Sequence, residues 1–277
     1  MIPVAHLRNT TTVIVHTSEL GPCSDGRASA YLIHKVLPRA EIVEMAYNTR
    51  AHKSLATQRG LLFADFSPHA CHVDDLLSVE PIVLDHHATA EKVVRRFKYG
   101  VYADAKADPG VSGAMLAYRE VVIPLAPTFA CAHCRYLQRE APCSCPSLVD
   151  LHEIALLVGI RDTWQTHSID FEIASNLSAF LSFVALEDLL AMPPDEVLRQ
   201  GQAMGPRIRA KTIAGARDAV RDATHLHIGP HHVLLFPGGV LSSEASTLAP
   251  KNGIVVAYDF LHEGDDIEPI DGLAGKD

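Results

Sequence analysis

The chain has 277 residues, of which 48% are hydrophobic, and it carries a formal net charge of −9 at pH 7. This length allows one large domain or two smaller ones, and the acidic balance argues against stable binding of duplex nucleic acid, which needs a basic face. The sequence has no apolar run near the roughly 20 residues of a membrane-spanning helix, and it does not begin with the pattern of a secretion signal. We therefore expect a cytoplasmic protein without a membrane partner, and no sequence feature indicates its oligomeric state.

Short apolar runs alternate with segments of helical periodicity in the first third of the chain. The runs at 11–15, 41–46, 60–64 and 81–84 are typical of buried strands, and a helix is predicted over 25–37. Strands that alternate with helices predict an α/β fold, in which a parallel sheet is covered on both faces. In such sheets, ligands bind at the carboxyl ends of the strands.

The following part of the chain is mostly helical in pattern. Helices are predicted over 112–122, 147–158, 173–183 and 186–192. The segment 195–223, rich in Arg, Ala and Gln, predicts one long helix that is broken near Gly205-Pro206 and connects two domains. Beyond it, 233–236 and 254–260 are typical of strands, and a further helix is predicted to start at Ser242.

Acidic and imidazole side chains stand where the predicted strands end. His16 follows the first strand, Asp65 ends the third, and Asp85, His86 and His87 end the fourth. Because the carboxyl ends of parallel strands meet at one edge of a sheet, we expect these side chains to lie close together.

Two further aspartates extend this set, namely Asp25 before the first helix and Asp162 after the helix predicted over 147–158. Carboxylates gathered at one edge repel each other and raise each other's pKa unless cations neutralise them. Oxygen and imidazole ligands suit Mn, Mg, Zn or Fe, and two metal ions can activate water and bind phosphate oxygens. The pattern indicates metal-assisted hydrolysis of a phosphate ester or anhydride, although each residue taken singly could instead cap a helix or fill a turn.

Four segments in this order resemble the motifs of the DHH phosphoesterases, a family named for the Asp-His-His that stands here at 85–87. The segments are CSDGRASAYL with the preceding His16, then LLFADFS, IVLDHHATAEK and GIRDTW. The sequences of these segments are most similar to those of the nanoRNase-B-like subgroup, which comprises phosphodiesterases of short oligonucleotides and cyclic nucleotides. The likeness runs over about residues 11–260, and the stretch 124–146 has no counterpart in it.

The resemblance implies a role for each of these side chains. Two divalent cations, Mn²⁺ or alternatively Mg²⁺, would share Asp65 and would be ligated by His16, Asp25, Asp65, His86 and Asp162. The catalytic pair would be His87 and Asp85: His87 would face the substrate phosphate or the leaving oxygen, and Asp85 would orient the metal-bound His86. The nucleophile would be a hydroxide that bridges the two metal ions.

The resemblance also implies a domain organisation. A parallel-sheet DHH catalytic domain over 1–192 would be joined by a helical linker over 193–223 to a smaller α/β domain over 224–277. In the family, this second domain grips the substrate with a Gly-rich loop that contains a histidine. Since we find no such loop in 224–277, we expect the second domain to be shortened.

The first motif departs from the family pattern in two ways. Cys23 stands two residues before Asp25, where the family often has another aspartate, and a thiolate there would prefer softer metals. His16 lies nine residues before Asp25, farther than in the family, so that Glu19 is an alternative ligand.

The unmatched stretch 124–146 carries four cysteines in two close pairs, at Cys131, Cys134, Cys143 and Cys145. Four thiolates suit a tetrahedral structural Zn²⁺, for which His133 is a substitute ligand. The alternative is a reduced loop without a metal, since disulfides are rare in the compartment that we expect.

We therefore expect a metal-dependent phosphodiesterase that hydrolyses a small phosphate-containing substrate, such as a short oligonucleotide, as an exonuclease, or a cyclic nucleotide. Two alternatives stay open on the sequence alone. One is a pyrophosphate or polyphosphate hydrolase, and the other is a non-catalytic member that binds a nucleotide or a protein.

Overall fold

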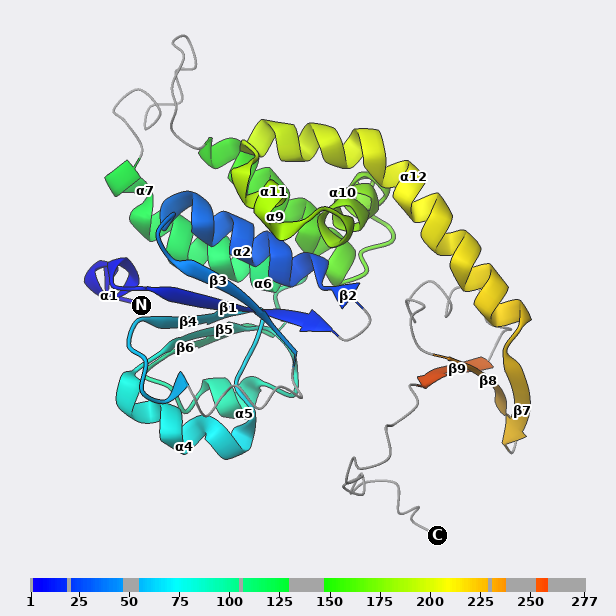
Figure 1. The fold of residues 1–277 in the computed structure, drawn as a ribbon, viewed down its shortest axis with the longest axis horizontal. Coiled ribbons are helices and arrows are strands. Elements are labelled where there is room, and N and C mark those ends of the chain that lie inside the picture. Colours follow the sequence, from blue (N-terminus) through cyan, green and yellow to red (C-terminus); the bar gives the residue numbers. More distant parts are fainter. Residues whose placement is uncertain are drawn as a thin grey trace. The chain divides into compact units, whose positions relative to one another are not determined.

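In a computed structural model of the protein, the described residues are 2–18, 21–46, 55–104, 107–129, 147–228, 231–237 and 253–258. The chain divides into two compact units, Met1–Ala210 and Lys211–Asp277 (Figure 1). The predicted zinc ligands Cys131, Cys134, Cys143 and Cys145 lie outside the described residues, as do His133, Glu19 and the predicted helix start at Ser242. The assignment of 1–192, 193–223 and 224–277 as catalytic domain, linker and substrate-binding domain stays a prediction.

The first unit is built on a mostly parallel sheet. Its parallel strands, in spatial order, are β3 (Glu41–Met45), β1 (Thr12–Ser18), β4 (Leu61–Ala64), β5 (Ile82–Asp85) and β6 (Tyr99–Tyr102). A short strand, β2 (Gly21–Pro22), pairs antiparallel with the end of β1. The predicted α/β fold with a parallel sheet is thus confirmed. In a sheet of this order, ligands bind where the chain switches from one side of β1 to the other.

The central strands are buried on both faces, which explains their continuous apolar sequences. In β1, Val13 and Val15 belong to the larger apolar core, whereas Ile14, which points to the opposite face, belongs to the smaller one. The same alternation holds in β5, where Leu84 faces the larger core and Val83 the smaller one.

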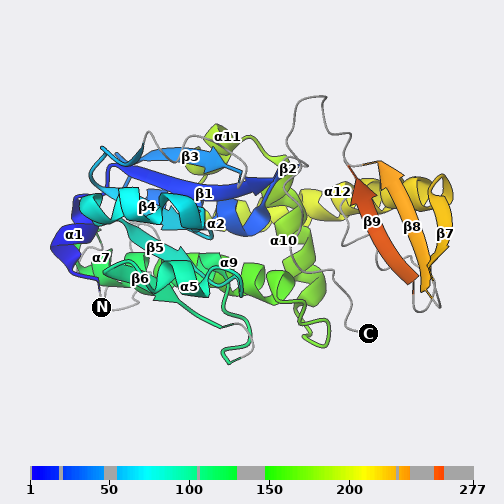
Figure 2. The same cartoon turned by 90° about the horizontal axis from the view of Figure 1, so that it is seen from below.

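Helices cover both faces of this sheet (Figures 1 and 2). On one face lie α2 (Ser24–Val36), α6 (Gly113–Ala117) and α9 (Leu148–Asp162), with α10 (Phe171–Phe183) and α11 (Leu186–Ala191) packed around them. On the other face lie α4 (Val73–Leu76) and α5 (Glu91–Val94). The remaining helical segments of this unit are α1 (Val4–Arg8), two 3₁₀ turns (Ala70–His72 and Leu77–Val79), a π-helical turn (Tyr118–Val122) and α7 (Ile123–Phe129).

The long helix α12 (Pro194–Arg221) continues through Gly205 and Pro206, so the predicted break near these residues is wrong. Proline inside a helix removes one backbone hydrogen bond. Close packing of α12 on α10 compensates for this lost hydrogen bond. The two backbones are so near that a Cβ atom at Gly205 would come 2.3 Å from the backbone oxygen of Asn176. The glycine therefore lets α12 lie directly on the backbone of α10. No helix among the described residues combines the length and the apolar character needed to cross a bilayer.

The second unit contains a sheet of three strands in the described part of the chain. They are β7 (Thr224–Ile228), β8 (His231–Pro237) and β9 (Gly253–Tyr258), with β8 antiparallel to β7 and parallel to β9. The sequence predicted strands at the positions of β8 and β9. It did not predict β7, whose sequence THLHI carries two histidines in place of apolar residues.

Close packing of α2 on β1 generates a test of the fold. A Cβ atom at Gly26 would come 2.3 Å from the backbone oxygen of His16, whereas one at Gly215 in α12 would meet no atom within 4 Å. We expect Gly26→Ala to lower the free energy of unfolding by about 1–3 kcal/mol, because the two backbones must separate. The matched control Gly215→Ala should raise it by up to about 1 kcal/mol, through helix propensity. Denaturant unfolding measures both changes, and equal stability of the Gly26→Ala protein and the unmodified chain would contradict the packing.

Candidate metal centre

The hairpin of β1 and β2 brings His16 to the site. Its register pairs residues 17 with 22 and 18 with 21, and one step further this register places His16 opposite Cys23. Donor atoms of His16, Cys23 and Asp65 lie within 4.8 Å of one another. His16 and Asp25 are nine residues apart in sequence, but the chain reverses direction between them. The hairpin therefore brings the segment before Asp25 back to His16 at the sheet edge.

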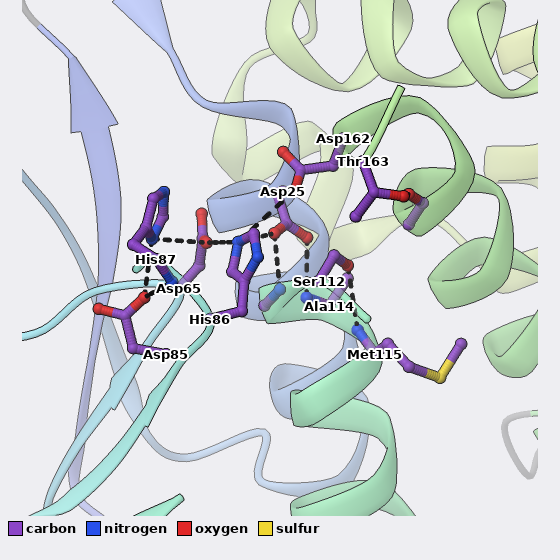
Figure 3. Close-up of polar contacts among 12 residues, drawn as sticks. Asp25, Asp65, Asp85, His86, His87, Ser112, Ala114, Met115, Asp162 and Thr163 are labelled. Atoms are coloured by element: carbon purple, nitrogen blue, oxygen red, sulfur yellow. Dashed lines mark hydrogen bonds and ion pairs between the residues drawn. The ribbon is translucent and has the colours of Figure 1, made fainter. Parts of the chain in front are cut away.

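Asp25, the second residue of α2, is fully buried and ties that helix to the start of α6. Its carboxylate accepts hydrogen bonds from the backbone N–H groups of Gly113 (2.6 Å) and Ala114 (2.8 Å) (Figure 3). Ser112 caps α6, because its Oγ accepts the N–H of Met115 at 3.3 Å. Two backbone donors stabilise a buried carboxylate in its charged form. Sequence reasoning missed these partners, since they lie almost ninety residues further along the chain.

Asp65 follows β4 directly and has left-handed backbone geometry, with a φ of 54°. Aspartate tolerates this conformation better than most residues do. Its exposed fraction is 1%, and a Cβ atom at Gly113 would come 2.3 Å from the Cβ of Asp65. A glycine at the start of α6 therefore allows Asp65 to pack against the same backbone segment that donates hydrogen bonds to Asp25.

The imidazole of His86 lies at the centre of the carboxylates (Figure 3). Its Nε2 is 3.2 Å from Asp65 Oδ1, 3.4 Å from Asp25 Oδ2 and 3.5 Å from Asp162 Oδ2. Burial by itself would lower the pKa of His86, but the hydrogen bonds and charges of Asp25 and Asp65 outweigh burial and raise the pKa to about 11. In the absence of a metal ion, a proton on His86 therefore supplies positive charge at the centre of the cluster.

The three carboxylates around His86 differ in how well they are stabilised. Burial and the charge of Asp25 raise the pKa of Asp65 well above its usual range, and they raise the pKa of Asp162 to about 6. Burial acts on Asp25 in the same direction, but hydrogen bonds from His86 and the backbone of Ala114 outweigh it and lower the pKa. The protein partners thus do not stabilise all three carboxylates in their charged form, a deficit that a divalent cation would relieve.

Asp85 contacts His87 and not His86, which corrects the expectation that Asp85 orients the imidazole of His86. Its Oδ1 accepts the backbone N–H of His87 at 3.0 Å and lies 2.7 Å from the Nδ1 of the same residue (Figure 3). The reason is the geometry of extended chain, where residues two apart point to the same side and the intervening one points away. Burial would raise the pKa of Asp85, but the hydrogen bond and charge of His87 lower it.

Cys23 lies against the carboxylate of Asp65, to which its Sγ donates a hydrogen bond of 3.5 Å. Burial and the charge of Asp65 raise the pKa of this thiol well above its usual range, so that without a cation it stays neutral. Burial and the positive charge of His87 lower the pKa of His16, which favours the neutral imidazole that a metal ligand must be.

All five predicted ligands occur in groups whose donor atoms lie within 4.8 Å of one another. The groups are His16, Cys23 and Asp65; Asp65, His86 and His87; and Asp25, His86 and Asp162. Asp65 and His86 each belong to two of these groups. The roles of these residues as ligands stay predictions, and their chemistry, carboxylate oxygen with imidazole nitrogen, fits divalent cations.

Asp162 reaches the cluster because α9 is longer than predicted and ends at this residue, with Asp162 in its last turn. A Cβ atom at Gly159 would come 2.3 Å from the backbone oxygen of Gly110, so α9 lies directly against the loop before α6. Gly159, directly after the predicted end of this helix, was visible in the sequence, but the backbone that it contacts was not.

Comparison with known proteins agrees with this architecture. No family model matches the chain, and no curated protein matches it significantly. Among solved structures, the DHH domain of a member of the s1p family of ribosomal proteins superposes with a TM-score of 0.52 at 12% identity, covering 92% of this chain and 73% of that one. This similarity shows that the chain has the fold of a DHH domain, as the sequence predicted, whereas the nanoRNase-B-like subgroup stays a prediction.

Two further structures are similar over most of this chain. An uncharacterized protein from Helicobacter pylori G27 has a TM-score of 0.47 at 11% identity and covers 90% of this chain and 82% of its own. RecJ from Thermus thermophilus, in complex with Mn²⁺, has a TM-score of 0.49 at 18% identity and covers 91% of this chain and 44% of its own.

The contact between Asp85 and His87 generates a test of the site. The hydrogen bond that His87 donates to Asp85 raises the pKa of His87 to about 9, despite burial, because it favours the imidazolium. We expect Asp85→Asn to lower this pKa toward the ordinary value of about 6.5, so that His87 loses its proton at lower pH. NMR titration of the ring protons in metal-free protein measures the shift.

The matched control for this test is Asp74→Asn, which removes an exposed carboxylate paired with Arg96 and should leave the His87 titration unchanged. An unchanged His87 titration in the folded Asp85→Asn protein would rule out the assigned contact.

Proposed function

We propose that this chain is a two-metal phosphoesterase of the DHH family that hydrolyses phosphodiesters of small substrates, such as short oligonucleotides or cyclic nucleotides. One observation carries the proposal: three carboxylates lie within 3.5 Å of the Nε2 of His86 at the carboxyl edge of a parallel sheet. Three buried or half-buried carboxylates gathered around one imidazole are suited to holding divalent cations rather than to stabilising the fold.

The donor set favours Mn²⁺ over Mg²⁺ for the two cations. Mg²⁺ is bound mainly by carboxylates and water, whereas this cluster mixes carboxylates with the imidazoles of His16 and His86. When bound, such cations would supply an activated water as the nucleophile and would neutralise phosphate oxygens. Asp65 and His86 each belong to two of the donor groups. In this proposal Asp65 is the shared ligand, because a carboxylate has two oxygens with which to bind two cations.

The geometry supports a role for His87 at the substrate. Its side chain is 38% exposed, against 9% for His86, so it stands at the rim of the cluster. Because Asp85 holds the Nδ1 of His87, the Nε2 on the other side of the ring is left to contact a phosphate or to donate a proton to the leaving oxygen. Asp85 is in this proposal a positioning residue, which keeps the ring protonated and oriented.

An aromatic surface beside Asp162 favours a substrate that contains a nucleobase. Trp164 is 42% exposed, has a left-handed φ of 52°, and stacks with the guanidinium of Arg161, 4.2 Å from the ring centroid. The left-handed φ belongs to the cap that ends α9, because the N–H groups of Trp164 and Gln165 donate to the carbonyls of Arg161 and Ile160. This cap leaves the ring exposed two residues from a candidate ligand. Nucleobases stack on such aromatic faces.

Cys23 favours one alternative, a non-catalytic member that binds a nucleotide. Its neutral thiol takes the place of an anionic ligand next to His16 and Asp65, which weakens this side of the centre for hard cations. Under this alternative, the protein would take up fewer than two Mn²⁺ ions per chain. A hydrolase of pyrophosphate or polyphosphate would bind the metal ions but would prefer anhydrides.

Activity measurements with defined metals test the proposal. Metal-free protein should hydrolyse a chromogenic phosphodiester and a dinucleotide after addition of Mn²⁺, and excess chelator should abolish the reaction. We expect His86→Ala and Asp65→Asn each to lower kcat/KM by about a hundredfold or more, because the first removes a proposed metal ligand and the second weakens the shared one.

The matched control is Asp74→Asn, whose exposed carboxylate lies in a surface ion pair with Arg96 and which should keep full activity. Pyrophosphate and polyphosphate complete the substrate panel. A folded protein that takes up Mn²⁺ and remains inert on every phosphodiester would refute the proposed activity.

Stacking on Trp164 gives a second prediction for this site. Since base stacking contributes about 1–3 kcal/mol, Trp164→Ala should raise KM for a dinucleotide about 5- to 150-fold, with a smaller change in kcat. Trp164→Phe should restore part of the affinity. The KM for an abasic analogue should be the same for both variants and for the unmodified chain. The fluorescence of Trp164, the single tryptophan of the chain, reports binding directly. Equal KM values for the dinucleotide would exclude this role.

A further inference from the structure

We propose that the hairpin of β7 and β8 carries a second, separate metal site, formed by His225, His227 and His232, for a borderline transition-metal cation of the Zn²⁺ class. The hairpin lies in the second unit of the chain. The inference is independent of the proposed phosphoesterase activity, because it rests on these three imidazoles alone.

The strand register brings the three imidazoles to one face of the hairpin. His225 and His227 are two residues apart in β7 and therefore point to the same side. His232 in β8 pairs directly with His227, and directly paired residues of antiparallel strands share a face. The opposite face carries Leu226 and Val233, which also pair with each other, and Val233 is 4% exposed.

The side chains of the three histidines already contact one another. The Nδ1 of His225 lies 2.9 Å from the Nε2 of His232, and their ring centroids are 5.0 Å apart. The ring of His227 stacks on that of His232 with 4.9 Å between centroids and 2° between planes. His232 thus contacts both other rings and is the centre of the cluster.

This arrangement needs only small adjustments to hold a metal ion. With Zn–N bonds of about 2.0–2.1 Å in tetrahedral geometry, two coordinating nitrogens lie about 3.3 Å apart. The pair of His225 and His232 would open by a few tenths of an ångström. His227 would rotate its ring toward the same point; its side chain is exposed, so little packing opposes the rotation. In the described part of the chain, the groups of three donor atoms that already lie within 4.8 Å of one another are all at the sheet edge. In the hairpin, the third ligand would therefore move into place only when the cation binds.

The donor set selects the kind of cation. Three imidazoles without a carboxylate suit Zn²⁺, Cu²⁺ or Ni²⁺ and disfavour Mg²⁺, which takes oxygen ligands. A cation here would join β7, at the edge of its sheet, to β8, and would thereby stabilise the pairing of the two strands. Three protein ligands leave a fourth position for water or an anionic group.

Zinc titration of the full-length chain tests the site. The metal-free protein is first saturated with Mn²⁺, and bound Zn²⁺ is then counted by isothermal titration calorimetry and by metal analysis after dialysis. We expect His232→Ala to bind one Zn²⁺ per chain fewer than the unmodified protein. Any zinc held by the predicted cysteine site contributes equally to both and cancels in the difference.

The matched control is His152→Ala, which removes an exposed imidazole from α9 whose ring lies 5.1 Å from that of Tyr118. This variant should bind as much Zn²⁺ as the unmodified chain. If His232→Ala fails to fold, His225→Ala and His227→Ala alter more exposed positions and should show the same loss. NMR of the histidine ring protons should show that Zn²⁺ shifts the signals of these three residues. Equal zinc stoichiometry in the unmodified chain and in the folded variants would overturn the proposal.

Discussion

The architecture of the first unit depends on the stabilisation of two buried carboxylates. Asp25 and Asp65 are 0% and 1% exposed, and an unpaired ion in such surroundings is destabilising by several kcal/mol. Backbone N–H groups at the start of α6 stabilise Asp25, and the imidazole of His86 contacts both carboxylates. Without a cation, a proton on His86 supplies the balancing charge, and a divalent cation would replace that proton. The chemistry proposed for the site is thus a consequence of its electrostatics.

Glycines set the distances on which this balance depends. Gly26 allows α2 to approach the backbone of His16, Gly113 allows α6 to approach Asp65, and Gly159 allows α9 to approach the loop before α6. Each of these contacts would be blocked by a single Cβ atom. They occur beside Asp25, Asp65 and Asp162, so the close packing of helices and the assembly of the carboxylates are one structural feature.

The two proposed metal sites differ in the hardness of their donors, and this difference separates them chemically. The sheet-edge centre mixes carboxylates with imidazoles and contains one neutral thiol, that of Cys23. The hairpin cluster of His225, His227 and His232 contains imidazoles alone. Hard cations favour the first set over the second, whereas borderline transition metals suit both, so the hairpin cluster discriminates against hard cations.

The sequence by itself determined the parallel strands β1, β3, β4 and β5, but not β6, and the set of acidic and imidazole side chains at the sheet edge. Strands buried on both faces must be apolar throughout, and the residues that end them stand next to them in the chain. Only the tertiary structure decided the partners: the contact of Asp85 with His87, the return of His16 through the β1–β2 hairpin, the backbone donors of Asp25 and the unbroken course of α12. It also revealed β7, whose two histidines interrupt the apolar pattern that predicts a strand. These features arise from contacts between segments far apart in the chain or from local geometry, and neither hydrophobic periodicity nor motif order carries information about them.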